Sequence, residues 1–146
     1  MNQSDRDRLF MGLAVEYSLR STDRSRKVGA VIVDASGRLV SYGWNGFPSG
    51  VIDRESRHER PAKYSWTEHA ERNAIYLAAK TGVSVAGCTM YVPWFPCMDC
   101  ARGIVQCGIS RLVAYRPDLT DPTWGGQFTS ALVLFEEAGV IVSFMS

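Results

Sequence analysis

The sequence has few cysteines, little net charge and no long hydrophobic run, and each shortage excludes a class of protein. Four cysteines in 146 residues are too few for the disulfide framework of a small secreted domain. A net charge of +1 gives no electrostatic reason to bind a nucleic acid polymer or an acidic membrane. No apolar stretch approaches the roughly 20 residues that cross a bilayer, and the first residues lack a signal-peptide pattern. We therefore expect a cytoplasmic protein that binds neither membranes nor polynucleotides.

The hydrophobic pattern alternates between helical and extended periods along one chain of ordinary domain length. We predict a single domain over residues 1–146, with Ser4 or Asp5 capping the first helix and Thr67 capping the second. The first two strands should form an antiparallel hairpin, and the later strands, separated by helices, should pair at least partly in parallel. The predicted helices span 4–19, 67–80, 97–107 and 128–138, and the predicted strands span 28–33, 39–44, 89–94, 111–115 and 140–144.

The residues that carry chemistry lie at the starts of two predicted helices. His69, Cys97 and Cys100 are three good zinc ligands, one short of a closed tetrahedral site, and a catalytic zinc needs an open position for water. Cysteines three apart share one helix face, and a helix N-terminus stabilises their thiolates. Glu71, two residues from His69, is placed to carry protons to and from that water.

Each part of this pattern alone has a less specific interpretation. A Cys-x-x-Cys pair can be a redox pair or half of a structural zinc site, and a lone His-Ala-Glu is usually a solvated helix start. A closed structural site would need a fourth ligand, but Cys88, Cys107 and His58 stand in no ligand-spaced pair. The combination with Glu71 therefore favours a catalytic zinc ion.

Two polar segments leave their roles open at this point. Residues 20–27 carry four cations before an apolar run, which is typical of a solvated connector. Residues 51–63 are rich in charge and poor in apolar side chains, so we predict an irregular excursion on the surface. Neither pattern by itself identifies a ligand.

The spacing of these motifs resembles the zinc-dependent cytidine and deoxycytidylate deaminase superfamily. His-Ala-Glu at 69–71 and Pro-Cys-Met-Asp-Cys at 96–100 match the superfamily's metal signature. Three further segments, at 28–33, 43–50 and 87–92, resemble its deoxycytidylate deaminase branch in the same order. The resemblance covers most of residues 20–115.

The resemblance implies a three-layer α/β/α cytidine deaminase-like fold with a mixed five-stranded sheet between helices. It implies hydrolytic deamination of dCMP to dUMP with release of ammonia, in which a zinc hydroxide attacks C4 of cytosine while Glu71 shuttles protons. Ala70 would place its amide near the base, and Asn45 would contact the sugar and base. The basic loop would meet the 5′-phosphate, with Arg26 as first choice and Ser21 as second, and Arg20 and Arg24 as further candidates.

The sequence departs from the superfamily pattern at three places. Many members carry extra Cys or His residues between the Asn-Gly loop and the catalytic His that hold a second, structural zinc, whereas this chain has only His58 there, so we expect no second zinc. The other two departures lie near the substrate. Where many members have a tyrosine after the fourth strand, this chain offers Tyr115, Arg116 or Trp124, and the sequence does not choose among them. Pro93 stands where a threonine is common, which affects the contacts to the base. The resemblance further implies a homo-oligomer, a hexamer in many members, and regulation by dCTP and dTTP.

Other substrates and one other function class fit the same motifs. CMP, a 5-modified cytosine nucleotide, a nucleoside or a free base could undergo the same deamination. A zinc module that binds nucleotides without catalysis is the alternative from a different class. Glu71 argues against that module, because a purely structural zinc has no use for a proton carrier.

Overall fold

The computed structural model describes residues 1–145 and contains one five-stranded sheet in the order β2-β1-β3-β4-β5. β1 pairs antiparallel with both β2 and β3, whereas β3, β4 and β5 run parallel to one another. The predicted mixed sheet with an N-terminal hairpin is therefore confirmed. The strands are β1 (Gly29–Val33), β2 (Leu39–Trp44), β3 (Thr89–Tyr91), β4 (Arg111–Tyr115) and β5 (Ile141–Met145).

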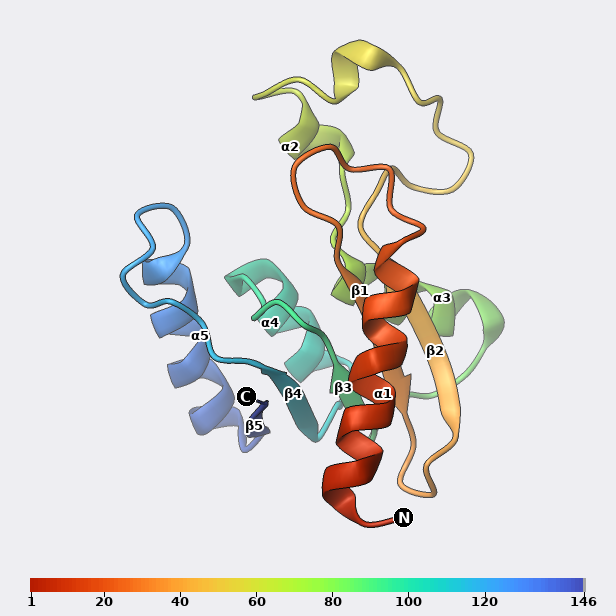
Figure 1. Cartoon of the computed structure of the whole chain (residues 1–146), viewed down its shortest axis with the longest axis vertical. Helices are drawn as coiled ribbons and strands as arrows, with labels where there is room; N and C mark the ends of the chain where they lie inside the picture. Colours follow the sequence, from red (N-terminus) through yellow and green to blue (C-terminus); the bar gives the residue numbers. More distant parts are fainter. Residues whose placement is uncertain (146) are drawn as a thin grey trace.

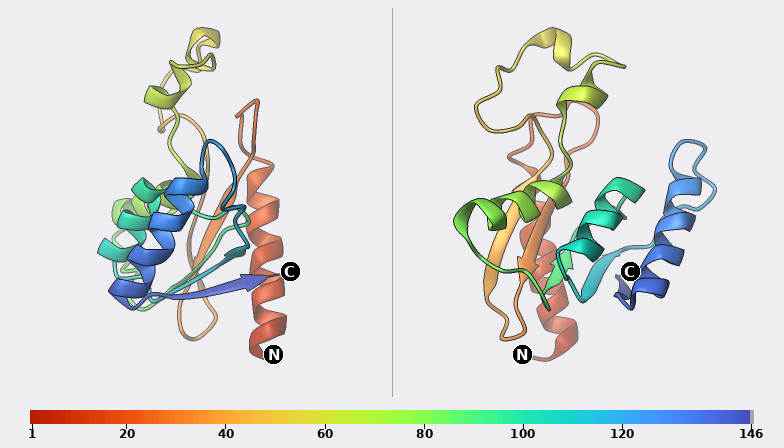
Figure 2. Two further views of the ribbon diagram at one scale, coloured as in Figure 1. Left: turned by 90° about the vertical axis from the view of Figure 1, so that its left-hand side faces the viewer. Right: turned by 180° about the vertical axis from the view of Figure 1, so that it is seen from behind.

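Helices cover both faces of this sheet (Figure 1). The left view of Figure 2 shows the N-terminal helix on one side of the sheet and the later long helices on the other. The lone helix is α1 (Gln3–Ser18), and the opposite layer consists of α3 (Ala70–Thr81), α4 (Met98–Gln106) and α5 (Gly125–Ala138). The 3₁₀ helix η1 (Glu55–Arg57) and the short α2 (Lys63–Trp66) belong to the segment that projects beyond one end of the sheet.

The side chains of β1 divide between two hydrophobic cores because successive residues of a strand point to opposite faces. Val31 and Val33 pack in the smaller core, together with residues of α1. Ala30 and Ile32 belong to the larger core, which α3, α4 and α5 cover. All five residues of β1 are consequently buried, and the strand reads as a continuous apolar run in the sequence.

Two glycines let the helices approach the hairpin closely. A Cβ atom at Gly29 would lie 2.1 Å from the carbonyl oxygen of Ala14 on α1. A Cβ atom at Gly43 would lie 2.5 Å from the backbone nitrogen of Ala74 on α3. Any larger residue would push the helix away from the sheet. Gly43 therefore fixes the distance of α3, the helix that carries Glu71, from β2.

Both N-terminal caps predicted from the sequence are wrong. Asn2 caps α1, and its side chain accepts a hydrogen bond from the Asp5 amide at 2.8 Å. The second helix begins at Ala70 instead of Thr67, with His69 in extended conformation at the N-cap. The cause is a long-range contact: the backbone of Glu68 pairs with that of Gly46 at 2.8 and 3.0 Å, which holds residue 68 in a β-bridge.

The last helix starts three residues earlier than its apolar pattern indicates. The Asp121 side chain accepts hydrogen bonds from the amides of Thr123 at 2.9 Å and Trp124 at 2.8 Å. These bonds turn the chain into α5 at Gly125, among residues whose composition is typical of a loop. Within residues 1–145, none of the helices combines the length and the apolar character needed to cross a membrane.

A polar network joins α1 to the centre of the sheet. Arg111 on β4 donates two hydrogen bonds to the carboxylate of Asp7, at 3.0 and 2.6 Å, and the Tyr91 hydroxyl donates a third at 2.7 Å. Burial alone would raise the pKa of Asp7, but the hydrogen bonds from Arg111, Tyr91 and Gln3 outweigh it and lower that pKa. Burial and the bond to Asp7 raise the pKa of Tyr91 to about 12. The network holds α1 in register on the sheet.

We expect the substitution Asp7→Asn to lower the free energy of unfolding at pH 7 by about 2 kcal/mol, because it leaves Arg111 largely buried without its counter-charge. Since the folded pKa of Asp7 is depressed, its contribution is present above its unfolded pKa of about 4 and is lost as the pH falls through the folded value. Urea denaturation between pH 7 and pH 3 should therefore show the wild type and the variant converging. Asp5→Asn, which changes only an exposed pair with Arg8, is the control. An equal loss in that control would contradict this role for Asp7.

Candidate metal centre and active-site cleft

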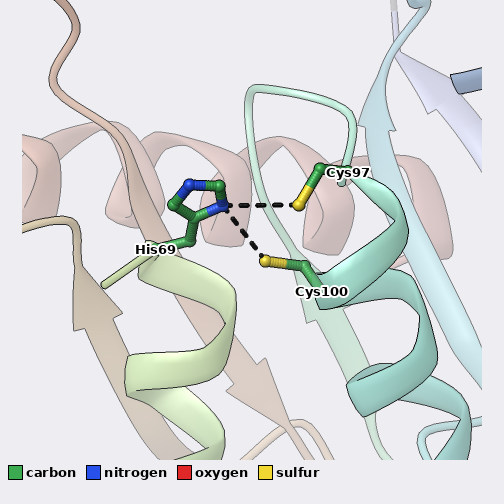
Figure 3. Close-up of side chains that lie close together, drawn as sticks. All are labelled: His69, Cys97 and Cys100. Atoms are coloured by element: carbon green, nitrogen blue, oxygen red, sulfur yellow. Dashed lines mark hydrogen bonds between the residues drawn. The ribbon is translucent and has the colours of Figure 1, made fainter. Parts of the chain in front are cut away.

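The three candidate zinc ligands converge at the N-termini of α3 and α4 (Figure 3). His69 is the N-cap of α3, Cys97 is the N-cap of α4, and Cys100 lies one turn into α4. The Nδ1 atom of His69 is 3.5 Å from Sγ of Cys97 and 3.4 Å from Sγ of Cys100. Both cysteines are buried, so the site is formed within the fold and not on its surface.

This geometry fits a zinc ion. With Zn–S of about 2.3 Å and Zn–N of about 2.0 Å, a tetrahedral site places its nitrogen and sulfur ligands about 3.5 Å apart. The two measured nitrogen–sulfur distances agree with that value. Three protein donors leave one tetrahedral position, the arrangement that catalytic zinc sites share. Among residues 1–145, these are the only three or more potential metal ligands whose ligand atoms all lie within 4.8 Å of one another.

The cysteine pair is prepared for metal binding by its own hydrogen bonds. A bond from the Cys100 thiol, together with one from His69, lowers the pKa of Cys97 to about 4 despite burial. The same cysteine–cysteine bond and burial raise the pKa of Cys100. Cysteine binds zinc as a thiolate, and the raised pKa of Cys100 means that its thiol holds its proton more tightly than an ordinary cysteine does. A metal ion that binds both sulfurs must displace this proton, so affinity should fall as the pH falls.

Glu71 lies beside this group, on the first turn of α3. Its side chain is only 4% exposed, yet it lines the same cleft as His69 and Cys97. Burial raises the pKa of its carboxyl group, and the nearby His69 opposes that effect only in part. A buried carboxyl group next to a metal site can exchange protons with a molecule bound in the cleft, because bulk water does not reach the carboxyl group to exchange protons instead.

The cleft extends from the metal centre to the loop that follows α1. Its volume is about 700 Å³, within the range of pockets that hold small molecules. His69, Ala70, Glu71 and Cys97 line one end. Ala70 is the first residue of α3, so its amide has no acceptor within the helix and is available to a ligand.

Asn45 and Arg26, two of the residues expected to contact the nucleotide, also line the cleft. The Asn45 side chain accepts a bond from the Val28 amide at 2.9 Å and donates one to the Arg26 carbonyl at 2.8 Å. It thereby fixes the basic loop against the start of β1. The Arg26 guanidinium stacks on Trp94, with Cζ 3.6 Å from the ring centroid. Trp94 in turn packs edge-on against the buried Phe128, so the core sets the position of Arg26.

Four other predicted substrate contacts lie elsewhere. The Ser21 hydroxyl is buried and donates to the Asn45 carbonyl at 2.8 Å. Arg24 pairs with exposed Glu55, and the Arg20 guanidinium lies over the rings of Tyr17 on α1 and Trp44 on β2. Tyr115 is 38% exposed and lies outside the cleft lining. The partners Asn45, Glu55 and Trp44 lie far from the basic loop in the sequence. The composition of the loop therefore could not show which of its cations faces the cleft.

The rest of the cleft lining includes residues around the start of α5 and around α2, most of which sequence reasoning missed. Trp124, one of three alternatives for the family's tyrosine, lines the cleft with Thr123 and Gln127, whereas Arg116 lies over Phe144. Gln127 accepts a hydrogen bond from the Met98 amide at 3.1 Å, which ties α5 to the start of α4. Arg60 and Lys63 line the cleft from the segment before α2 and from α2 itself. Their sequence context, dense in charge, indicates only a solvated surface.

The comparisons with known proteins agree with this geometry. The family model for the cytidine and deoxycytidylate deaminase zinc-binding region matches residues 4–116, which include all three candidate ligands and Glu71. The chain belongs to this deaminase family. It is therefore a hydrolase of the deoxycytidylate deaminase type with a zinc-binding domain, and the metal signature at His69, Cys97 and Cys100 is the family's own.

Relatives of this deaminase come from bacteria, animals and phages. It is 41% identical over 139 residues to an uncharacterized deaminase of Aliivibrio fischeri, covering 93% of the chain and 90% of the relative. It is 37% identical over 137 residues to human deoxycytidylate deaminase, covering 90% and 74%. A crystal structure of dCMP deaminase from cyanophage S-TIM5 in complex with dCMP and dUMP superposes with a TM-score of 0.79 at 28% identity, covering 99% of each chain. The fold is thus shared over its whole length.

We expect purified wild-type protein to retain about one zinc ion per chain after dialysis, and His69→Ala and Cys100→Ser to lose most of it, because each removes one of three protein ligands. Cys107→Ser changes a half-buried cysteine outside the cluster and should leave zinc content unchanged. Metal analysis at pH 8 and pH 6 should show weaker retention at the lower pH. Full retention in His69→Ala would contradict the assignment of this ligand.

Proposed function

We propose that this deaminase converts dCMP and water to dUMP and ammonia. The observation that carries the proposal is that a single cleft contains both the metal centre with Glu71 and the Arg26 side chain at its rim. The cleft thus has a metal centre at one place and a cation at another. A substrate with a neutral reactive ring and a negatively charged group several bonds away matches that arrangement. The dCMP complex of the cyanophage relative and the deoxycytidylate deaminases among the curated relatives support this choice.

Each residue of the inner cleft has a defined role in this reaction. Zinc, when bound to His69, Cys97 and Cys100, supplies a Lewis acid that makes a water molecule more acidic. The carboxylate of Glu71 accepts a proton from the attacking water and delivers it to N3 of the pyrimidine. A second transfer through Glu71 protonates the departing amino group, so that ammonia leaves as the C4–N bond breaks. The Ala70 amide donates to the pyrimidine ring and orients it.

The outer cleft positions the nucleotide. The guanidinium of Arg26 binds the 5′-phosphate, and its stacking on Trp94 reduces the freedom it loses when it does so. Asn45 holds the backbone of residues 26–28 and presents its remaining amide hydrogen to the sugar. Trp124 supplies an aromatic wall for the base in place of the family's tyrosine. A homo-oligomer, regulation by dCTP and dTTP, and a cytoplasmic location stay predictions.

Glu71→Gln should reduce kcat for dCMP by roughly 10²- to 10⁴-fold, because glutamine keeps the shape of the side chain but cannot accept a proton. Zinc content should be unchanged, since Glu71 is not a ligand. Ammonia release and metal analysis on the same preparations measure both quantities. Glu16→Gln, on the exposed face of α1, is the matched control. Deamination at the wild-type rate in Glu71→Gln would exclude the proton-carrier role.

Arg26→Ala should raise KM for dCMP by about 10- to 100-fold while kcat changes little, because charge-assisted hydrogen bonds to the phosphate are lost in ground and transition states alike. KM for deoxycytidine, which has no phosphate, should not change. Arg38→Ala, an exposed arginine on the hairpin turn, serves as control. The assay should include CMP, 5-substituted dCMP, deoxycytidine and cytosine. Wild-type turnover of an unphosphorylated substrate without turnover of dCMP would overturn the substrate assignment.

A further inference from the structure

The outer end of the cleft has a second basic wall, contributed by Arg60 and Lys63. The sequence places these residues in a surface excursion, more than thirty positions beyond the basic loop. In the structure the excursion folds back, and α2 lies next to the loop that connects α1 to β1 (Figures 1 and 2). Two segments far apart in the chain therefore face the same space.

Lys63 is held against the basic loop by polar contacts. Its Nζ atom lies 3.2 Å from Oδ2 of Asp23 and 3.5 Å from Oγ of Ser25. The Lys63 side chain is only 13% exposed and that of Asp23 only 7%. A lysine that is largely withdrawn from solvent at a ligand cleft has a fixed position and a strengthened electrostatic field.

The Asp23 carboxylate also shapes the loop itself. Its Oδ1 accepts hydrogen bonds from the amides of Ser25 at 2.8 Å and Arg26 at 3.1 Å. This turn presents the Ser25 hydroxyl toward the opposite segment, where Nη2 of Arg60 donates to it at 3.3 Å. Ser25 is thus the point at which Arg60 and Lys63 meet, and all three residues line the cleft with Arg26.

The charges at this end of the cleft are unbalanced. Arg26, Arg60 and Lys63 contribute three positive charges, and Asp23 contributes one negative charge, which leaves a local excess of two. A phosphate monoester carries about −1.5 to −2 at pH 7 and offers three acceptor oxygens. Its charge is close to the local excess, and its three oxygens can accept hydrogen bonds from the three cations and the Ser25 hydroxyl, because each oxygen has more than one lone pair.

We infer that Arg60 and Lys63, together with Ser25, form the second half of a phosphate-binding site whose first half is Arg26, and that this site selects a nucleoside monophosphate. The inference rests on the proposed function, because it assigns the phosphate of the same substrate. The inference adds that recognition of the phosphate depends on the excursion at residues 51–63, which lies outside the metal motif. The two segments close on the phosphate from opposite sides.

The test compares Arg60→Ala and Lys63→Ala with the wild type, all zinc-loaded, using dCMP and deoxycytidine. Each variant should raise KM for dCMP about tenfold or more, with kcat within about threefold, and should leave kcat/KM for deoxycytidine unchanged. Lys63→Arg keeps the charge and should stay within about threefold of the wild-type KM for dCMP. Arg54→Ala removes an exposed cation of the same segment that does not line the cleft, and should have no effect.

The outcomes separate this inference from the proposed function. If Arg26→Ala raises KM for dCMP but Arg60→Ala and Lys63→Ala do not, the second wall is not part of the phosphate site, although dCMP stays the substrate. If the variants weaken dCMP and deoxycytidine equally, the two residues are structural and the inference fails. If the wild type deaminates deoxycytidine but not dCMP, the proposed function itself fails. Calorimetric titration with dUMP and deoxyuridine gives a readout independent of turnover: the preference for dUMP over deoxyuridine should be about tenfold smaller in Arg60→Ala and in Lys63→Ala than in the wild type.

Discussion

The site depends on one geometric constraint: a histidine and two cysteines from separate helices must reach a common point within a few ångströms. The fold satisfies it by directing the N-termini of α3 and α4 toward each other. His69 and Cys97 stand at the two N-caps, where the backbone is still extended and the side chains point past the helix ends. Free amides at both helix starts stabilise thiolates and other anions in the same place. The position of α3 is therefore as important to the centre as the ligands themselves.

The position of α3 is in turn fixed by contacts to the hairpin. Gly43 allows the helix backbone to lie directly on β2, and the β-bridge between Gly46 and Glu68 stops the helix from extending past His69. The Ser41 hydroxyl adds a hydrogen bond to the Ala74 carbonyl at 2.6 Å. These contacts explain why the Gly-Trp-Asn-Gly segment accompanies the metal motif. Its glycines serve packing and pairing, while Asn45 connects the end of the hairpin to the basic loop and the start of β1.

The sequence predicts the elements and the metal centre well because both depend on local spacing. A Cys-x-x-Cys at a helix start and a continuous apolar run in β1 constrain structure within a few residues. The sequence predicts helix starts less well, since the cap at His69 results from a bridge to Gly46, and the start of α5 results from the side chain of Asp121. Propensity and periodicity contain no information about such partners. The same limit applies to the basic loop, where four cations have similar sequence contexts but only Arg26 rests on Trp94.

Reaction chemistry and substrate choice are consequently determined by different kinds of contact. The residues proposed to act on the pyrimidine ring, Glu71 and the candidate metal ligands, lie on or at the start of helices that pack directly on the central sheet. The residues proposed to read the phosphate lie on loops and on the short α2. Asp23 and Ser25 hold Lys63 and Arg60 there, and only Arg26 rests on the core, through Trp94. Loops of this kind can change sequence without disturbing the catalytic geometry. A deaminase built in this way can alter the charged group it accepts, through residues such as Arg60 and Lys63, while it keeps the same mechanism at C4.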